Sequence, residues 1–539
     1  MSDAFAFVLH SHLPYARGAG RWPHGEEWVH EAILGTYLPL LVTLHDLRAA
    51  EVPYRLTLGL TPVLLEQLAD RDVIHRAIEY VDDQIKRAET DRTTLADAGR
   101  REIAAFYASL YRSLGSAYVV RFERDIVGAF ADLAATGHVE ILTSAATHGY
   151  LPLLDEPSVH LQLETGRRTS RRLLGVEPTG IWLPECAYRP GLERILEAHG
   201  FTHFFTDAEL ILGRSIARGR MRRSTRERHR SGAGLAAVAT IEQPPAQGTN
   251  ATDVFRPYLV ADSDVAVIAR HPLVSGQVWS AHRGYPGDPH YREFHRKDER
   301  SGLRYWRVTD VSTGLHEKAE YAPALAAARV RTHTAHFIDL VRSELDAGRA
   351  RTGHDGMLVV TFDSELFGHW WFEGVDWLGG VLRGLAAAGP PTTTIADRLA
   401  QEPPTERIDL REGSWGKDTD HSTWLNEKTA WMWHELDQMR SRFAELRPTV
   451  ASDDLHQRAL RQATRELLLA QSSDWPFLVT TGQAADYAGD RFRSHQLRFH
   501  RACELARHAG AADEVELRSL EHADNVFPEI DPSSFSQTA

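Results

Sequence analysis

The sequence predicts an α/β fold built on a parallel barrel, followed by a mostly helical C-terminal domain. Three observations support this prediction. Short apolar runs typical of buried strands recur through the first part of the chain, and segments with helical spacing of apolar residues separate them. Most of these runs end in a polar residue. Polar groups at the carboxyl ends of parallel strands are typical of a barrel whose functional site lies at that face.

Seven runs along the chain have the character of buried strands. With their ends they cover residues 4–9, 54–60, 138–142, 180–188, 201–207, 265–271 and 357–360. The polar residues at these ends are His10, Thr61, Thr143, Glu185, Asp207, Arg270 and Asp363. We therefore expect a barrel of seven strands rather than eight.

The barrel is predicted to span residues 1–400 and to carry a helical insertion. Residues 63–136 are charged and helix-forming over more than the length of one crossover helix, so we expect a helical subdomain there. Pairs of prolines after residue 386 interrupt the regular pattern and mark the predicted end of the barrel. Residues 401–539 are predicted to form the helical C-terminal domain, which contributes to the substrate cleft.

Two loop insertions are also expected, at about residues 213–260 and 272–320. The first contains eight arginines between residues 213 and 230. Such a cluster suits either a phosphate site or a mobile surface loop. The second is rich in aromatic residues, glycine and proline, which is typical of the rim of a cleft.

Length, charge and cysteine content limit the class of protein. A chain of 539 residues is too long for one ordinary core, so we expect at least two domains. A net charge of −13 argues against a nucleic-acid binder and favours an enzyme with a neutral or cationic substrate. Two cysteines form neither a disulfide framework nor a thiolate metal cluster and fit a reducing cytoplasm. We expect no signal peptide and no membrane span.

Residues 361–374 carry the most distinctive chemistry of the chain. They follow an apolar strand and hold Asp363, then His369, Trp370 and Trp371. A carboxylic acid can protonate a leaving oxygen, and indole faces stack on the C–H faces of sugar rings, so this combination suits cleavage of a sugar polymer. The alternative is structural: an aspartate that caps a helix, followed by core aromatics.

A second carboxyl group and several histidines stand at other strand ends. Glu185 is the second candidate carboxylate. His10 and His12 alternate along an extended backbone, so both imidazoles lie on one face; they suit a metal site, hydrogen bonds to sugar hydroxyls or a structural pair. His148 follows the third strand. Glu140 lies inside that strand and needs a partner, either an active-site histidine or a structural ion pair.

Further tryptophans are candidates for contacts with sugar rings. Trp22 and Trp279 lie in aromatic loops of the barrel. In the C-terminal domain, Trp415 and Trp475 stand beside glycine and proline in turn-like contexts that suit a sugar platform. The spacing of the other tryptophans in this domain suits a helical core, and they are Trp424, Trp431 and Trp433.

Six stretches, spread over nearly the whole chain, carry a resemblance to a known family. They are HSHLPY at 10–15, GHVEIL at 137–142, WLPECAY at 182–188, TFDSELFGHWW at 361–371, TWLNEKTAWMWHEL at 423–436 and SSDWPFLVTTGQAADYA at 472–488. Together they resemble glycoside hydrolase family 57, and within it the 1,4-alpha-glucan branching enzymes. The last stretch resembles the C-terminal module of those enzymes.

The resemblance implies a fold, a reaction and roles for particular residues. The implied fold is an incomplete (β/α)7 barrel with an inserted helical domain and a C-terminal helical domain. Glu185 is the implied nucleophile and Asp363 the implied acid/base of a retaining reaction, which requires their carboxyl groups to be roughly 5–5.5 Å apart. No cofactor and no metal are expected. The resemblance implies that substrate is contacted by His10, His12, Trp279, Trp415, Trp424 and Asp474. The residue patterns add as expected substrate contacts Trp22, His148, Arg270, His369, Trp370 and Trp475.

The two predicted activities, branching and hydrolysis, differ in the molecule that finally accepts the sugar. In branching, a glucan 6-hydroxyl replaces water, so the site must exclude water while the covalent intermediate survives. Branching enzymes of this family resemble one another in a loop after the fifth strand that carries a tyrosine, whereas this chain has no tyrosine between Tyr188 and Tyr258. Branching of a glycogen-like glucan is the first expectation, and amylase-like hydrolysis on the same scaffold is the alternative.

Two other interpretations belong to different classes of protein. A metal-dependent barrel hydrolase would use His10 and His12 with further ligands at strand ends. A catalytically silent protein would bind glucan without turning it over. The expected partner is an alpha-glucan polysaccharide, with no nucleic acid and no membrane, in the cytoplasm. The oligomeric state is left open, with a monomer favoured.

Overall fold

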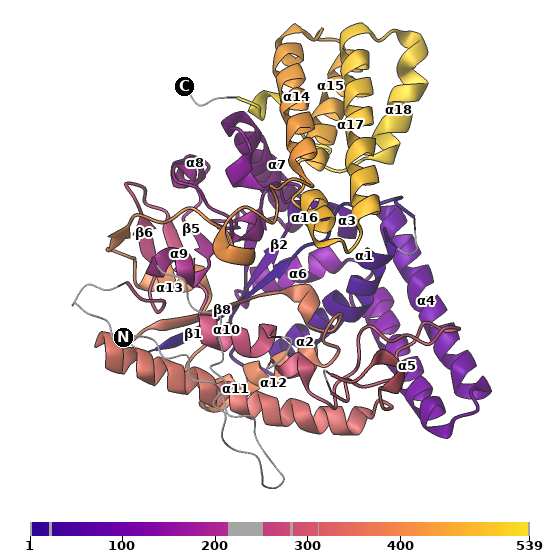
Figure 1. Cartoon of the computed structure of the whole chain (residues 1–539), viewed down its shortest axis with the longest axis vertical. Coiled ribbons are helices and arrows are strands. Elements are labelled where there is room, and N and C mark those ends of the chain that lie inside the picture. Colours follow the sequence, from indigo (N-terminus) through magenta and orange to yellow (C-terminus); the bar gives the residue numbers. More distant parts are fainter. Residues whose placement is uncertain (1–2, 21–23, 214–251, 281–283, 311, 537–539) are drawn as a thin grey trace.

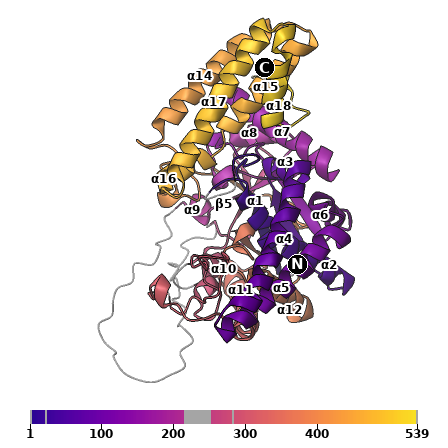
Figure 2. The ribbon, with the colours of Figure 1, turned by 90° about the vertical axis from the view of Figure 1, so that its right-hand side faces the viewer.

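The computed structural model describes residues 3–20, 24–213, 252–280, 284–310 and 312–536. These residues form a barrel domain with a helical domain stacked on one end of it (Figure 1, Figure 2). Within these ranges, no helix combines the length and the apolar character needed to cross a membrane.

One sheet of nine strands forms the centre of the barrel domain. Its strands are β1 (Ala4–Ser11), β2 (Leu56–Leu60), β3 (Val139–Ser144), β4 (Gly180–Trp182), β5 (His203–Thr206), β6 (Tyr258–Val260), β7 (Ala266–Ala269), β8 (Met357–Asp363) and β9 (Arg407–Ile408). Their order in the sheet is β8-β1-β2-β3-β4-β5-β7-β6-β9. The strands from β8 to β7 run parallel, which confirms the seven predicted barrel strands. The short β6 and β9 were not predicted, and β6 lies in the segment expected as the first loop insertion.

The barrel is incomplete between β7 and β8. In the described part of the chain these two strands form no ladder. A single backbone hydrogen bond joins them, from the N–H of His271, just after β7, to the carbonyl of Val359 in β8 over 2.7 Å. Beyond β7 the sheet continues into antiparallel β6 and then β9. The incomplete (β/α)7 barrel implied by the resemblance is therefore confirmed.

The strand register brings the polar strand ends to one edge of the barrel. His10 in β1 lies opposite Asp363 in β8 and Gly59 in β2. Below this edge, alternate side chains of the strands fill the barrel, as in other parallel barrels. This apolar cluster includes Ala6, Val8, Leu142, Trp182, Phe205, Ile268, Met357, Val359 and Ile395.

Helices surround the sheet and form the C-terminal domain. Those of the barrel domain are α1 (Glu27–Ala32), α2 (Leu38–Ala49), α3 (Pro62–Ala69), α4 (Arg71–Thr94), α5 (Ala98–Ser116), α6 (Ile126–Ala135), α7 (Glu156–Leu174), α8 (Leu192–Ala198), α9 (Ala208–Leu212), α10 (Pro272–Trp279), α11 (Pro323–Thr352), α12 (Gly374–Ala388) and α13 (Ile395–Gln401). Those of the C-terminal domain are α14 (Ala430–Leu446), α15 (Asp454–Ala470), α16 (Asp474–Thr481), α17 (Ala485–His508) and α18 (Glu514–Ala523).

Helices α4 and α5 form an antiparallel pair, here called the arm, that projects beside the barrel (Figure 1). The side chains of Asp70 and Asp97 cap the two helices by accepting hydrogen bonds from backbone N–H groups of their first turns. The predicted helical insertion, residues 63–136, holds α3 to α6. Of these four helices, α3 and α6 pack on barrel helix α7, so that α4 and α5 alone project from the barrel.

The C-terminal helices form a bundle that shares its core with the barrel domain. Helices α14, α15, α17 and α18 enclose this core (Figure 2). Four buried residues of the barrel domain belong to the same cluster, and they are Tyr15, Val63, Ala146 and Leu161. This shared core fixes the start of α16, at Asp474, above the polar strand ends.

The buried carboxylate of Glu140 has a structural partner. One oxygen lies 3.1 Å from Nε2 of His203, which is fully buried. The other accepts hydrogen bonds from the Thr57 hydroxyl (2.8 Å) and from the backbone N–H groups of Ile395 and Ala396 at the start of α13. Burial alone would raise the pKa of Glu140, but His203 and these donors lower it. Of the two predicted partners, the structural ion pair is present.

Replacing Glu140 by leucine should destabilise the barrel. The change leaves His203 and two N–H groups of α13 without an acceptor, so we expect a loss of about 3 kcal/mol in the free energy of unfolding. Thermal unfolding of Glu140→Leu, beside the exposed control Glu529→Gln, measures it. Equal melting temperatures for the two variants would show that the buried pair does not stabilise the fold.

Candidate active site

A cavity of about 680 Å³ opens at the edge where the parallel strands end. We call it the strand-end cavity. The predicted site residues that line it are His10, His12, His148, Glu185, Asp363, His369, Trp370, Trp415 and Asp474. Charged residues that the sequence did not single out also line it, and they are Glu27, Glu31, Lys297, Arg304 and Glu365.

Glu185 lies in a strained turn directly after β4. Its backbone is left-handed, with φ 63° and ψ 22°, and the next residue, Cys186, has φ 49°. Such a conformation costs on the order of 1 kcal/mol for a residue other than glycine, so its surroundings must hold it. Trp415 does this: its backbone N–H donates to the Glu185 carbonyl (3.1 Å), and its indole N–H donates to the carboxylate (2.8 Å).

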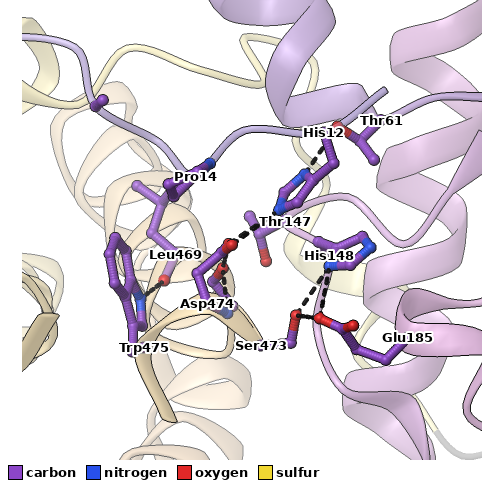
Figure 3. Close-up of polar contacts among 12 residues, drawn as sticks. His12, Pro14, Thr61, Thr147, His148, Glu185, Leu469, Ser473, Asp474 and Trp475 are labelled. Carbon is purple, nitrogen blue, oxygen red and sulfur yellow. Dashed lines mark hydrogen bonds and ion pairs between the residues drawn. The ribbon is translucent and has the colours of Figure 1, made fainter. Parts of the chain in front are cut away.

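Ser473 connects the C-terminal domain to the Glu185 carboxylate (Figure 3). Its hydroxyl lies 3.1 Å from Oε1 of Glu185 and 2.8 Å from Nδ1 of His148. The backbone N–H of Ser473 donates to the carbonyl of His148 over 3.0 Å. Beyond His148, its Nε2 lies 3.1 Å from Nε2 of His10. Four buried or half-buried side chains thus form one chain of hydrogen bonds.

Burial fixes the direction of this chain. It lowers the pKa of His10 and of His148 well below 6.5, so both imidazoles are neutral and each carries one N–H. When Glu185 is ionised, the Ser473 hydroxyl donates to it. His148 must then donate to Ser473 from Nδ1 and accept from His10 at Nε2. Every donor therefore points toward Glu185 and stabilises its carboxylate form.

Opposing effects set the pKa of Glu185. Burial is the largest effect, and it raises the pKa to about 7, with a further contribution from the charge of Asp474. The hydrogen bonds from Trp415 and Ser473 and the charge of His12 act in the other direction. These donors keep Glu185 able to ionise near neutral pH.

His12 forms a second connection to the C-terminal domain. Its Nε2 lies 3.0 Å from the carboxylate of Asp474, and its Nδ1 lies 3.1 Å from the Thr61 hydroxyl. Burial lowers the pKa of His12, but the charge and hydrogen bond of Asp474, together with the charges of Glu185 and Glu365, raise it overall. The His12 ring stacks on His148, with ring centroids 3.9 Å apart. Because both ring nitrogens of His12 have partners, this histidine fits hydrogen bonding better than metal binding.

The strand-end cavity is not where potential metal ligands cluster. In the ranges that the structure describes, a group of three such residues occurs once, in the C-terminal bundle, and consists of Glu466, His495 and Asp524. His495 lies 2.8 Å from the Glu466 carboxylate, and Arg498 lies 2.7 Å from Asp524. These contacts are those of a buried polar network in a helical core.

Asp363, at the end of β8, has a different environment from Glu185. Among the described residues, none hydrogen-bonds its carboxyl group. Burial raises the pKa of Asp363 well above 3.8, and the charges of Glu365 and Glu185 raise it further, opposed by Arg270. The surroundings of Asp363 therefore favour its protonated form, whereas the donors described above help Glu185 to ionise. Two carboxyl groups with such different surroundings can act as acid and nucleophile.

Glu365 is a third buried carboxyl group at the cavity and was not among the predicted site residues. It accepts hydrogen bonds from the Tyr37 hydroxyl and from the backbone N–H of His12 (3.2 Å). Burial raises the pKa of Glu365 to about 7. The sequence feature that could have indicated a role for Glu365 is its position two residues after Asp363 in the same motif. Ser473 carried no such signal, because a serine before an aspartate is common at any helix start.

Two predicted sugar contacts are wrong for this structure. Trp475 is fully buried in the C-terminal core, where its indole N–H donates to the carbonyl of Leu469 over 2.8 Å. Trp424 is also buried and stacks on Tyr150, with centroids 4.5 Å apart. Helix α16 starts at Asp474, so Trp475 points into the bundle, whereas Trp415 reaches the cavity.

Two further predicted residues lie outside the cavity lining, and a third lies outside the described residues. Arg270 pairs with Asp207 (2.6 Å) and reaches the site through its charge on Asp363. Trp279 is half-buried, and its indole N–H donates to the carbonyl of Thr361 over 3.2 Å. Trp22 lies outside the described residues. All eight arginines of the cluster between residues 213 and 230 also lie outside them.

Comparison with protein families matches nearly the whole chain. The model of glycosyl hydrolase family 57 matches residues 6–410, and that of the 1,4-alpha-glucan branching enzyme C-terminal domain matches residues 434–535. A 1,4-alpha-glucan branching enzyme of Thermococcus kodakarensis is 41% identical over 98% of this chain and 78% of its own length.

Solved structures of similar enzymes superimpose on the whole fold of this chain. A family 57-type branching enzyme of Pyrococcus horikoshii superimposes with a TM-score of 0.88 at 37% identity, covering 100% of this chain and 98% of that one. The alpha-amylase AmyC of Thermotoga maritima superimposes with a TM-score of 0.83 at 29% identity, with both chains fully covered.

Removing the Ser473 hydroxyl should shift the pH dependence of turnover. Without this donor the pKa of Glu185 rises, so the acidic limb of the kcat/KM profile on alpha-glucan moves to higher pH. We expect turnover at neutral pH to fall about tenfold for Ser473→Ala, the effect of losing one hydrogen bond to a charged group. Ser473→Thr, which keeps the hydroxyl, is the matched control. An acidic limb at the wild-type pH in Ser473→Ala contradicts the proposed contact.

Neutralising Glu365 should shift the basic limb of the pH profile of kcat/KM. Its charge raises the pKa of Asp363, so Glu365→Gln lowers that pKa and moves the basic limb of the kcat/KM profile to lower pH. Glu27→Gln, at the same cavity, should leave the basic limb in place, because Glu27 is not among the charges that raise the Asp363 pKa. Equal basic limbs in Glu365→Gln and wild type would rule out this role for Glu365.

Proposed function

Because the chain belongs to glycosyl hydrolase family 57, we propose that it is a retaining 1,4-alpha-glucan branching enzyme that forms α-1,6 branches in a glycogen-like glucan. One observation carries the proposal: the C-terminal domain, whose sequence matches the branching enzyme C-terminal family, supplies Ser473 to the Glu185 carboxylate. The same domain supplies Asp474 to His12. The domain that matches the branching enzyme C-terminal family is therefore part of the proposed catalytic centre.

In the first step, Glu185 acts as nucleophile and Asp363 as acid. The Glu185 carboxylate attacks the anomeric carbon of an α-1,4-linked glucose unit. The glycosidic C–O bond breaks, and the proton of Asp363 goes to the departing oxygen. The released segment keeps the original reducing end and gains a 4-hydroxyl at its new non-reducing end. The rest of the donor remains bound through its anomeric carbon to Glu185 as an ester.

In the second step, Asp363 acts as base toward the acceptor. It takes the proton of a glucan 6-hydroxyl while that oxygen attacks the anomeric carbon and the ester bond to Glu185 breaks. Esterification removes the negative charge of Glu185, which is one of the charges that raise the Asp363 pKa. The pKa of Asp363 thus falls at the stage where it must accept a proton.

The surroundings of the two carboxyl groups suit a neutral polymer. Trp370, exposed by 45%, and Trp415 present flat indole surfaces at the cavity. The neutral His10 and His148 offer hydrogen bonds without adding charge. Both cysteines are free and buried, which fits the reducing cytoplasm in which we place the enzyme.

Hydrolysis of alpha-glucan is the second candidate activity. The observation in its favour is the absence of a tyrosine between Tyr188 and Tyr258 in the sequence, where related branching enzymes carry one in a loop. Most of that segment lies outside the described residues. The superposition on AmyC shows that the scaffold alone does not distinguish the two activities.

Product analysis on amylose tests the proposed function. The wild-type enzyme should introduce α-1,6 branches, counted after enzymatic debranching, in excess of new reducing ends. Glu185→Gln and Asp363→Asn should each reduce branch formation by at least about a thousandfold, because each removes a group required in the transition state. Reducing ends without branches would identify a hydrolase. Near wild-type turnover in either variant would show that the two carboxyl groups are wrongly assigned.

A further inference from the structure

A second cavity, of about 610 Å³, lies between the arm and the segment 292–304. We call it the arm cavity. Helices α4 and α5 form one side of it, α1 and the start of α12 form another, and Figure 1 shows the arm beside α1. Its volume is within the roughly 300–1,000 Å³ of ligand-binding pockets. The residues found only in this cavity take no part in the two chemical steps described above.

The arm cavity shares a wall with the strand-end cavity. Five residues line both cavities, and they are Glu27, Glu31, Lys297, Arg304 and His369. Within this wall the Lys297 ammonium lies 3.0 Å from the Glu31 carboxylate, and His369 lies 3.9 Å from the same carboxylate. One layer of side chains therefore separates the two spaces, so a polymer bound in one is close to the other.

The lining of the arm cavity offers neutral hydrogen-bonding groups. Tyr80, Gln84 and Tyr111 line it, and among the described residues none of these three side chains has a hydrogen-bond partner. Burial raises the pKa of Tyr111 to about 12 and that of Tyr80 well above 10, so both hydroxyls stay protonated and can donate. Tyr80 and Tyr111 are partly exposed, and no polar atom of the three side chains is sealed off from solvent, so a ligand in the cavity can take the place of water as their hydrogen-bond partner.

Aromatic and charged groups narrow the chemical class of ligand. Phe106 and Phe372 line the cavity and meet edge to face, with ring centroids 6.2 Å apart. Acidic Glu27 and Asp376 stand in the lining together with Arg292, so charges of both signs are present. Apolar ring surfaces, neutral donors and mixed charges suit an uncharged polyhydroxyl chain and disfavour an anion.

The position of the arm cavity indicates which glucan chain it holds. Part of its lining comes from the segment that follows the end of β8, namely Gly368, His369, Phe372, Val375 and Asp376. None of its described lining residues belongs to the group around Glu185, formed by His148, Trp415 and Ser473. In a retaining reaction, the acid/base stands beside the oxygen that leaves and the oxygen that attacks, whereas the nucleophile stands beneath the donor sugar. The cavity is thus on the acceptor side.

We propose that the arm cavity binds the acceptor glucan chain, through Tyr80, Gln84 and Tyr111, and guides its 6-hydroxyl past the shared wall to the ester on Glu185. This inference rests on the proposed function, because only transfer to a second chain needs an acceptor. The acceptor oxygen forms the new bond to the anomeric carbon as the bond to Glu185 breaks, and Asp363 receives the proton. An acceptor held here competes with water for the intermediate.

The test is the triple variant Tyr80→Phe, Gln84→Leu, Tyr111→Phe, assayed on amylose. It removes three polar groups and keeps the aromatic rings. The ratio of new branches to new reducing ends should fall about tenfold, while the total rate of donor cleavage stays within about twofold of wild type. Raising the concentration of maltoheptaose as acceptor should restore transfer, because the defect is in acceptor affinity. Tyr118→Phe, a buried tyrosine outside both cavities, should match wild type.

A direct binding measurement separates this inference from the proposed function. Maltoheptaose binding by calorimetry is compared in Glu185→Gln with and without the triple change, so that no turnover intervenes. We expect at least about a fivefold weaker affinity, or the loss of one of two sites, with the triple change. Unchanged binding and an unchanged branch ratio would overturn the inference even if the wild type branches amylose. A wild type that forms no branches would overturn the proposed function, while binding still reports on the cavity.

Discussion

The Ser473 hydroxyl is the contact on which the candidate active site depends, because it joins two domains at the carboxylate that must attack. It lies between His148 of the barrel and Glu185, and the backbone N–H of the same serine fixes His148. The shared core of the bundle and the barrel serves this contact by setting the start of α16. The strained turn at Glu185 and the indole of Trp415 complete the support. The catalytic face is therefore a product of both domains.

The three buried carboxyl groups show how one cavity can hold groups with different protonation. Burial raises the pKa of Glu185, Asp363 and Glu365, but their neighbours differ. Glu185 receives hydrogen bonds from Trp415 and Ser473, which favour its ionised form. Asp363 receives none among the described residues and stands near two negative charges, which favour its protonated form. The chemistry of the two steps follows from this asymmetry, since loss of one charge in the intermediate changes the pKa of the remaining acid.

The fold and the centre of the site were predictable from the sequence because they depend on local patterns. Apolar runs ending in polar residues gave all seven barrel strands, and the motifs placed Glu185, Asp363 and the histidines at one edge. What the sequence could not provide is the direction of side chains fixed by tertiary packing. Trp415 and Trp475 have similar local contexts, yet one donates to Glu185 and the other is buried in the bundle. Two other contacts likewise join distant parts of the chain. Glu140 and its partner His203 are 63 positions apart, and Ser473 and Glu185 are 288 positions apart.

The central claim is that Glu185, held by groups from both domains, is the residue that becomes covalently bound to the sugar. The most direct test is to trap the intermediate with a fluorinated maltosyl fluoride, digest the protein and locate the added sugar by mass spectrometry. We expect a single glycosylated peptide containing residues 182–188, with the sugar on Glu185, and no adduct in Glu185→Gln. An adduct on Asp363 or Glu365, or complete turnover of the reagent without any covalent species, would contradict it.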